Sequence, residues 1–187
     1  MTELYIIGFI LAVAFLFGVV IFNNLVTAKN HCQEAWSGID VQLKLRHNLV
    51  PNLVTAVKTY AQHESAVLEK TVQARQQAKE CASERVATRG QSESHLSTQL
   101  SQIFVIAEAY PELKADELFL ELQQKLVDIE DNIQMARRFY NGCVRNFNIA
   151  IQSFPSNIVA KIFNFKEAVF FEFTDSREGV SVSFNEL

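Results

Sequence analysis

The chain has 187 residues, a formal net charge of −4 at pH 7 and 49% hydrophobic residues. This length suits one domain, or one small domain with an appendage. A net-acidic chain without a dense basic block is a poor candidate for nucleic-acid binding, because phosphate neutralisation needs clustered Lys and Arg. The three cysteines are odd in number and widely spaced, so they form neither a complete disulfide framework nor a zinc-site pattern. Composition therefore excludes nucleic-acid modules, zinc modules and disulfide-stapled secreted domains.

The N-terminus contains a candidate membrane-spanning helix. The run from Leu4 to Phe22 has no charged residue. At a rise of about 1.5 Å per residue it covers about 28 Å, close to the hydrocarbon thickness of a bilayer. A cleaved signal peptide is the main alternative, but no Lys or Arg precedes the run, and the run is longer than a usual signal-peptide core. We predict a retained transmembrane anchor in residues 1–28.

The charge pattern beside this anchor indicates its orientation. Lys29 follows the apolar run, whereas the segment before it carries Glu3 and no basic residue. The positive-inside rule then favours a cytoplasmic location for the rest of the chain. The free cysteines agree with a reducing compartment. We predict a single-pass protein with its helical part more readily placed in the cytoplasm than in the periplasm.

Apolar residues after the anchor follow a heptad typical of helices that pack on other helices. Two series show it: Trp36, Leu43, Val50, Val57 and Ile39, Arg46, Leu53, Tyr60. We predict one long helix from Asn30 to Thr88, with Gly90 suited to a C-cap after it. Pro51 lies inside this run, where it either kinks one helix or separates two. The unbroken heptad favours the kink.

Further helices are predicted in the second half of the chain. Ser92 or Ser94 can cap a helix that ends near Tyr110–Pro111, and Asp116 can cap the next one. The latter has apolar residues at spacings of three and four and stops near Phe154–Pro155: Leu118, Leu122, Leu126, Ile129, Ile133, Ala136, Tyr140, Cys143, Phe147, Ala150 and Phe154. A short helix from about Asn157 to Phe163 follows.

The C-terminal tail, 166–187, has a different pattern. Its residues 168–173 are aromatic and β-leaning, and 180–184 alternate apolar and polar residues. A small hairpin around 175–179 is therefore possible. The predicted fold class is all-α: an N-terminal transmembrane helix, a long-helix antiparallel bundle of three to four helices in 29–165, and this short β-leaning tail.

Several motifs in the chain resemble the LemA family of bacterial membrane proteins. They occur in order from the anchor to about Phe173: Glu34-Ala35-Trp36, Arg46 to Pro51-Asn52, Tyr110-Pro111, Arg137-Arg138-Phe139-Tyr140-Asn141 and Phe154-Pro155. The resemblance implies an N-terminal anchor and an α-helical antiparallel bundle. It implies no enzyme activity, and nothing is carried over to the tail beyond Phe173.

A charged residue at an apolar position needs a partner. Arg46 occupies such a position, Asp40 flanks the same seam, and Glu130 and Arg137 share one column of the later long helix. A buried guanidinium requires carboxylate or carbonyl partners. We predict that these four residues form a structural polar network. A ligand or ion site inside the bundle, and exposed or inter-subunit pairing, are the alternatives.

Signatures of catalysis are missing together. The four histidines, His31, His47, His63 and His95, are not paired at helical spacing, no Glu-x-x-His motif occurs, and neither a phosphate-binding glycine loop nor Gly-x-Ser-x-Gly is found. We expect no enzyme activity, no cofactor, no metal and no small-molecule substrate.

Association is the remaining function class. We predict a membrane-anchored scaffold that forms a homo-oligomer or organises protein partners at the bilayer, and an uncovered apolar stripe on a long helix would mark the partner surface. The alternative is an adaptor or sensor module for a membrane protease or envelope-stress machinery.

Overall fold

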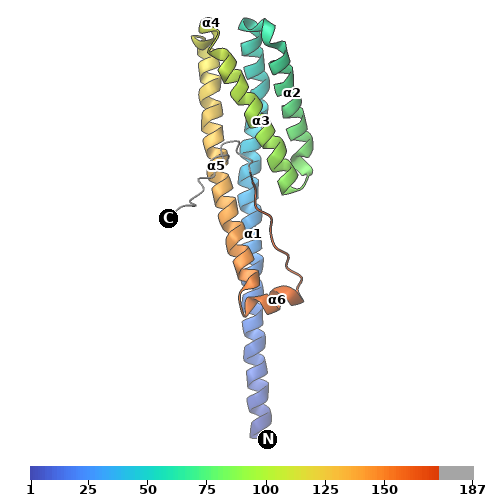
Figure 1. Ribbon diagram of the computed structural model, residues 1–187. Helices are drawn as coiled ribbons and strands as arrows, with labels where there is room; N and C mark the ends of the chain where they lie inside the picture. The colour runs from blue at the N-terminus through green and yellow to red at the C-terminus, as the bar shows by residue number, and fades with distance from the viewer. Residues whose placement is uncertain (173–187) are drawn as a thin grey trace, which may run out of the picture. The chain divides into compact units, whose positions relative to one another are not determined.

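The computed structural model describes residues 1–172, so most of the predicted hairpin tail lies outside the described residues. Within this range the chain is all-helical and contains no strand (Figure 1). The helices are α1 (Thr2–Tyr60), α2 (Ser65–Glu80), α3 (Val86–Ala107), α4 (Pro111–Lys114), α5 (Glu117–Gln152) and α6 (Ser156–Ile162). Two 3-10 turns, Gln62–Glu64 and Cys81–Ser83, flank α2.

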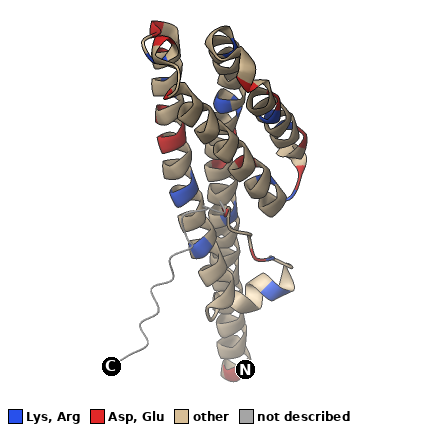
Figure 2. Cartoon of the chain, turned by 45° about the horizontal axis from the view of Figure 1, so that its top comes forward, with Lys and Arg blue, Asp and Glu red and all other residues tan. Residues whose placement is uncertain are grey.

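The apolar N-terminal run forms the first part of α1. Its most apolar 18-residue window has a mean hydropathy of 2.9 and no buried residue, and the helix is long enough to cross a membrane. Figure 2 shows no charged position along this part of α1 except an acidic one at its N-terminus. The apolar run and the helix after it are continuous, since α1 is one helix.

Pro51 lies within α1, so the alternative in which it separates two helices is wrong. A proline cannot donate the backbone hydrogen bond that would reach the carbonyl four residues earlier, which is that of His47. The structure supplies a substitute, because Arg75 Nε on α2 donates to the His47 carbonyl oxygen at 2.6 Å. The carbonyl that Pro51 leaves without a helical partner is therefore satisfied by a neighbouring helix.

The prediction of one helix up to Thr88 is wrong. The chain reverses after Tyr60, and α2 runs back beside the C-terminal part of α1 (Figure 1). Val57, Ala61 and Leu68 on the two sides of the reversal are all buried in the same core. Local helix propensity does not predict this reversal. The reversal is stabilised by the burial of apolar side chains from α1 and α2 in one core.

Gly90 is not a C-cap but lies inside α3. A Cβ at this position would overlap the carbonyl oxygen of Glu172, and the buried ring of Phe171 lies close by. Glycine here allows close approach of another backbone segment rather than a left-handed turn. The predicted caps Ser92 and Ser94 are also wrong, because α3 begins at Val86 and both hydroxyls bond to carbonyls within the helix.

Asp116 caps α5 as predicted. Its Oδ1 accepts the Phe119 N–H at 2.8 Å, and its Oδ2 accepts the Tyr60 hydroxyl at 2.9 Å. The backbone N–H of Phe119, and then the Tyr60 hydroxyl, hold the pKa of Asp116 below its ordinary value. The predicted apolar face of α5 is correct in the middle and wrong at its ends, where Leu118 and Phe154 are exposed while Phe119 and Ile151 are buried. A heptad drifts around a straight helix, so the buried face shifts by a residue along α5.

The chain divides into two compact units. Unit 1 contains Met1–Val41 and Ile133–Phe170; among the described residues, unit 2 contains Gln42–Asn132 together with Phe171 and Glu172. The core of unit 2 collects buried side chains from α1, α2, α3, α4 and α5. The predicted domain limits at 28 and 165 remain a prediction.

Candidate functional site

Unit 2 holds a buried charged group, here named the Arg46 cluster: Arg46, His47, Glu93, Ser97 and Glu130. The Arg46 side chain is only 1% exposed. Its Nη1 donates to Ser97 Oγ at 2.7 Å and to Glu130 Oε2 at 2.9 Å. Its Nη2 donates to Glu93 Oε2 at 2.5 Å and to the Glu93 carbonyl oxygen at 3.3 Å. One guanidinium thus joins α1, α3 and α5.

Helix periodicity brings these side chains together. Arg46 takes an apolar heptad position on α1, between Ile39 and Leu53. Glu93 takes the corresponding position on α3, one turn before Leu96 and two turns before Leu100, which are both buried. Each charged residue therefore points into the core with the apolar residues of its own helix, and only pairing makes that burial tolerable.

Glu93 is the fully buried member of the cluster. His47 Nε2 lies 3.0 Å from its Oε1 and 3.2 Å from its Oε2. Burial is the largest single effect and acts to raise the pKa of Glu93. The hydrogen bond from His47 and the charge of Arg46 together outweigh it, so the pKa lies below its ordinary value. Glu93 is therefore held as a carboxylate in the folded protein.

The Arg46 cluster is suited to holding helices together. The two η nitrogens of Arg46 bond to protein oxygens, so these contacts resemble a structural ion-pair network more than an open ligand site. Among residues 1–172 no group of three or more His, Cys, Asp or Glu side chains could hold a metal ion.

Of the predicted polar network, Arg46 and Glu130 are ion-paired within unit 2. Asp40 and Arg137 belong to unit 1, and their place in the network stays a prediction. Sequence reasoning missed His47 and Glu93. A signal for Glu93 was present, because it continues the apolar column of Leu96, Leu100 and Ile103 at spacings of three and four. The sequence carries no comparable signal for His47, because its role in the cluster depends on its contact with Glu93, which is distant in the chain.

The residues of the family motifs are divided between packing positions and exposed positions. In unit 1 the rings of Trp36 and Tyr140 are 5.2 Å apart, and the Tyr140 hydroxyl donates to the Val169 carbonyl oxygen at 2.9 Å. Pro51 lies in α1, Pro111 begins α4 and Tyr110 precedes it. Pro155 and Asn141 are half-buried, while Glu34, Asn52 and Arg138 are exposed.

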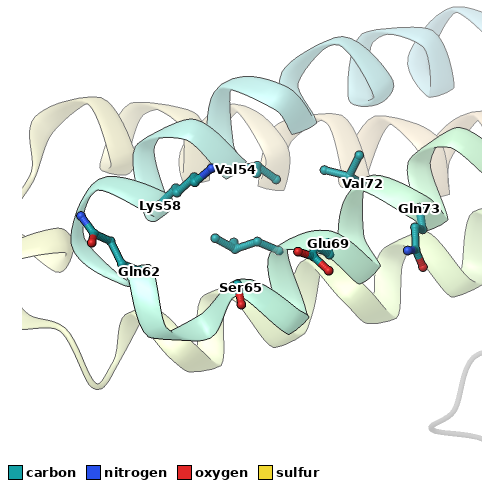
Figure 3. Close-up of a pocket in the computed structure, with 8 residues that line it drawn as sticks. Val54, Lys58, Gln62, Ser65, Glu69, Val72 and Gln73 are labelled. Carbon is teal, nitrogen blue, oxygen red and sulfur yellow. The ribbon is translucent and has the colours of Figure 1, made fainter.

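A hollow of about 350 Å³ lies between the C-terminal end of α1 and α2 (Figure 3). Val54 and Val72 point toward one another across it, and the exposed side chains of Lys58 and Glu69 stand at its edge (Figure 3). The lining combines apolar and polar residues without a buried charge, so it defines no particular ligand chemistry.

The fold and these sites define a class: an all-helical protein with an apolar N-terminal helix long enough to span a membrane and a buried ion cluster between helices. A profile of the LemA family matches residues 35–184. The chain belongs to the LemA family. The match continues beyond Phe173, where the resemblance was expected to end, and it includes residues of the tail up to 184.

Three curated proteins illustrate what the chain is similar to. Magnetosome protein MamQ 2 of Paramagnetospirillum magneticum is 25% identical over 194 residues, which cover 90% of this chain and 71% of MamQ 2. Magnetosome protein MamQ of Magnetospirillum gryphiswaldense is 24% identical and covers 80% of this chain and 64% of its own. Protein LemA of Metamycoplasma hominis is 26% identical over 185 residues, which cover 98% of this chain and 84% of that protein.

Proposed function

We propose that the protein is a non-catalytic, membrane-anchored scaffold that self-associates through its helical part. In this proposal the run from Leu4 to Phe22 crosses the bilayer, and 29–165 act as a long-helix antiparallel bundle on the cytoplasmic face of a bacterial membrane. Nearly all large apolar side chains of this run are exposed in the isolated chain, and a bilayer would cover them.

One observation carries the self-association. Outside the apolar run, α5 exposes three large apolar side chains of unit 1: Met135 at 52%, Phe139 at 66% and Ile149 at 54%. The helical period places these residues, with Gly142 between them, on one face. We name this face the α5 stripe. An added Cβ at Gly142 would meet no atom within 4 Å, so the backbone is open there as well.

A second copy of the same chain is the partner that the α5 stripe fits best. Exposed large apolar side chains that recur on one face of a helix outside the membrane are typical of a protein contact. The exposed Asn146 lies on this face between Gly142 and Ile149, so the α5 stripe combines apolar side chains with one polar side chain. Two such stripes can face one another by two-fold symmetry, because each then supplies the same apolar surface to the other.

The test is the mass of the full-length protein in mild detergent, measured by light scattering with the detergent contribution subtracted. The chain mass is 21.2 kDa. A discrete mass of several chains is expected. A monomer would overturn homomeric scaffolding and favour the adaptor alternative, for which a stoichiometric heterologous partner should be recovered.

A further inference from the structure

The segment that follows α5 returns to the end of the apolar run of α1. Within unit 1 the rings of Phe163 and Phe22 have centroids 4.6 Å apart, and the Phe165 ring lies 5.9 Å from that of Phe22. Phe22 is the last residue of the charge-free run. If that run spans the bilayer, as the proposed function has it, residues 153–166, here named the α6 segment, lie at the level of the membrane surface.

The α6 segment exposes apolar side chains at this level. Phe154 is 80% exposed and Ile162 is 71% exposed, and both Ile158 and Phe163 are exposed as well. Ile158 and Ile162 are four residues apart on α6 and therefore share a face. Exposed large apolar side chains at the depth of the headgroups are typical of elements that enter the bilayer interface.

A basic hollow adjoins this segment. We name it the juxtamembrane hollow; its volume is about 590 Å³, and its lining includes Phe22, Phe163, Phe165, Lys29, Asn164 and Lys166. The described residues that line it include two lysines and no acidic residue. The neighbouring Glu167 instead accepts a hydrogen bond from Gln152 and lines a separate hollow. Lys161, in the last turn of α6, is a further basic residue of the α6 segment.

The depth of the lysines fits a headgroup. Lys29 is seven residues beyond Phe22 on the same helix, a rise of about 10 Å. This distance places its backbone just outside the hydrocarbon, and its long side chain can reach back toward the headgroups. Lys166 follows directly after Phe165, whose ring packs on Phe22 and Phe147.

We propose that the juxtamembrane hollow binds the headgroup of an anionic phospholipid, with the apolar side chains of the α6 segment inserted into the adjoining bilayer interface. This inference rests on the proposed anchor. It adds a second contact with the membrane, and the contact is selective for lipid charge. The protein would then contact the membrane through two elements, the transmembrane run and the α6 segment. Two contacts would limit the tilt of unit 1 relative to the bilayer more than a single helix does.

The first experiment locates three positions in the full-length protein in nanodiscs. The native cysteines, Cys32, Cys81 and Cys143, are replaced by Ser, and an NBD fluorophore is attached to a single new cysteine. Ile162→Cys reports the α6 segment and Phe15→Cys reports the anchor. Val105→Cys, at a position 72% exposed on α3, is the control outside the membrane.

We expect lipid-borne doxyl groups to quench NBD at 15 and at 162, and aqueous iodide to quench it only at 105. Lipid quenching at 15 without lipid quenching at 162 would overturn this inference and leave the proposed anchor intact. Absence of lipid quenching at 15 would overturn both.

The second experiment measures lipid charge. The full-length protein is transferred from mixed phosphatidylcholine and phosphatidylglycerol micelles to plain detergent, and the retained lipid is counted by mass spectrometry. Retained phosphatidylglycerol should fall about fivefold for each lysine lost in Lys29→Gln with Lys166→Gln. The matched control, Lys70→Gln with Lys79→Gln in unit 2, should retain it. Equal retention in both variants would overturn the proposal, as would full displacement of the lipid by excess inorganic phosphate, which would indicate a free-phosphate site.

Discussion

Arg46 shows how one charged side chain can organise a helical core. Its guanidinium bonds to Glu93, Ser97 and Glu130, and Glu93 has no exposed side-chain surface. Burying such charges is unfavourable unless they are paired. The intact ion pair therefore adds little net stability, whereas removal of only one of its two members is strongly destabilising. We expect the cluster to favour one alignment of α1, α3 and α5, because all three bonds of the guanidinium must be made together.

Replacing Arg46 by Leu should lower the stability of the protein by about 3–5 kcal/mol, since Glu93 would remain buried without its cation. Thermal unfolding followed by circular dichroism checks this. Arg46→Met combined with Glu93→Leu should recover much of the loss, because the fully buried carboxylate is removed with its cation, while Glu130, the other partner of Arg46, is 37% exposed and stays hydrated. Lys70→Leu, at an exposed position of α2, is the control and should change little. An unchanged midpoint for Arg46→Leu would contradict the buried pair.

Glu93 should make the protein sensitive to acid. Its pKa in the folded protein lies below the ordinary value of 4.5, so its contribution to stability is complete above about pH 4.5 and is lost as the pH falls through the folded-state pKa. Glu93→Gln should be less stable at neutral pH but should lose less stability on acidification. Midpoints measured between pH 7 and 3 check this, and parallel curves for the two proteins would contradict it.

At this scale the sequence predicted two of the five residues of the Arg46 cluster. Arg46 was recognisable because it interrupts an apolar heptad, and Glu130 because it flanks one. Glu93 interrupts a heptad in the same way, but the predicted start of its helix at Ser92 or Ser94 placed it directly after or directly before the cap. An error in a helix boundary thus concealed a site residue.

The elements of the chain are positioned by a few specific residues, of which Gly90 is the clearest. Glycine inside a helix normally costs about 1 kcal/mol relative to Ala. At Gly90 a larger residue does not fit, because the carbonyl of Glu172 occupies the space of a Cβ. The loss in helix propensity is offset by burial of Phe171 beside α3.

Alanine at two glycines should therefore have opposite effects. Gly38→Ala, on an exposed face of α1 with no atom within 4 Å of the new Cβ, should raise the free energy of unfolding by about 0.5–1 kcal/mol. Gly90→Ala should lower it by about 1–3 kcal/mol, because the new methyl group displaces residues 171 and 172. Denaturant titration of both variants checks this. A gain in stability for Gly90→Ala would contradict the close approach.

Asp116 joins two elements, since it caps α5 and accepts the hydroxyl of Tyr60 at the end of α1. Asp116→Ala should lower the thermal midpoint by about 2–6 °C. Asp116→Asn should lose less, because an amide oxygen still accepts the Phe119 N–H. Asp131→Ala, at an exposed position of α5, is the matched control. Equal midpoints for the Ala and Asn variants would argue against capping.

At the scale of the whole molecule, the chain combines the apolar run of α1 with the exposed α5 stripe. If the α5 stripe mediates self-association, Phe139→Ser with Ile149→Ser should shift the mass in mild detergent toward 21.2 kDa while helix content stays constant. Val105→Ser removes an equally exposed apolar side chain from α3 and should leave the mass unchanged. If the double variant kept the mass of the native protein, the α5 stripe would not be the self-association surface.

The sequence by itself determined the helical class, the membrane-length N-terminal run, the cap at Asp116, the breaks at Tyr110–Pro111 and Phe154–Pro155, and the family. These features depend on local composition, periodicity and backbone chemistry, which neighbouring residues carry. Tertiary structure alone decided that α1 ends at Tyr60, that Gly90 receives a backbone segment, that Arg75 serves the carbonyl freed by Pro51, and that Glu93 is the buried partner of Arg46. Each of these depends on contacts between residues far apart in the chain, whose free energy appears only when helices share a core.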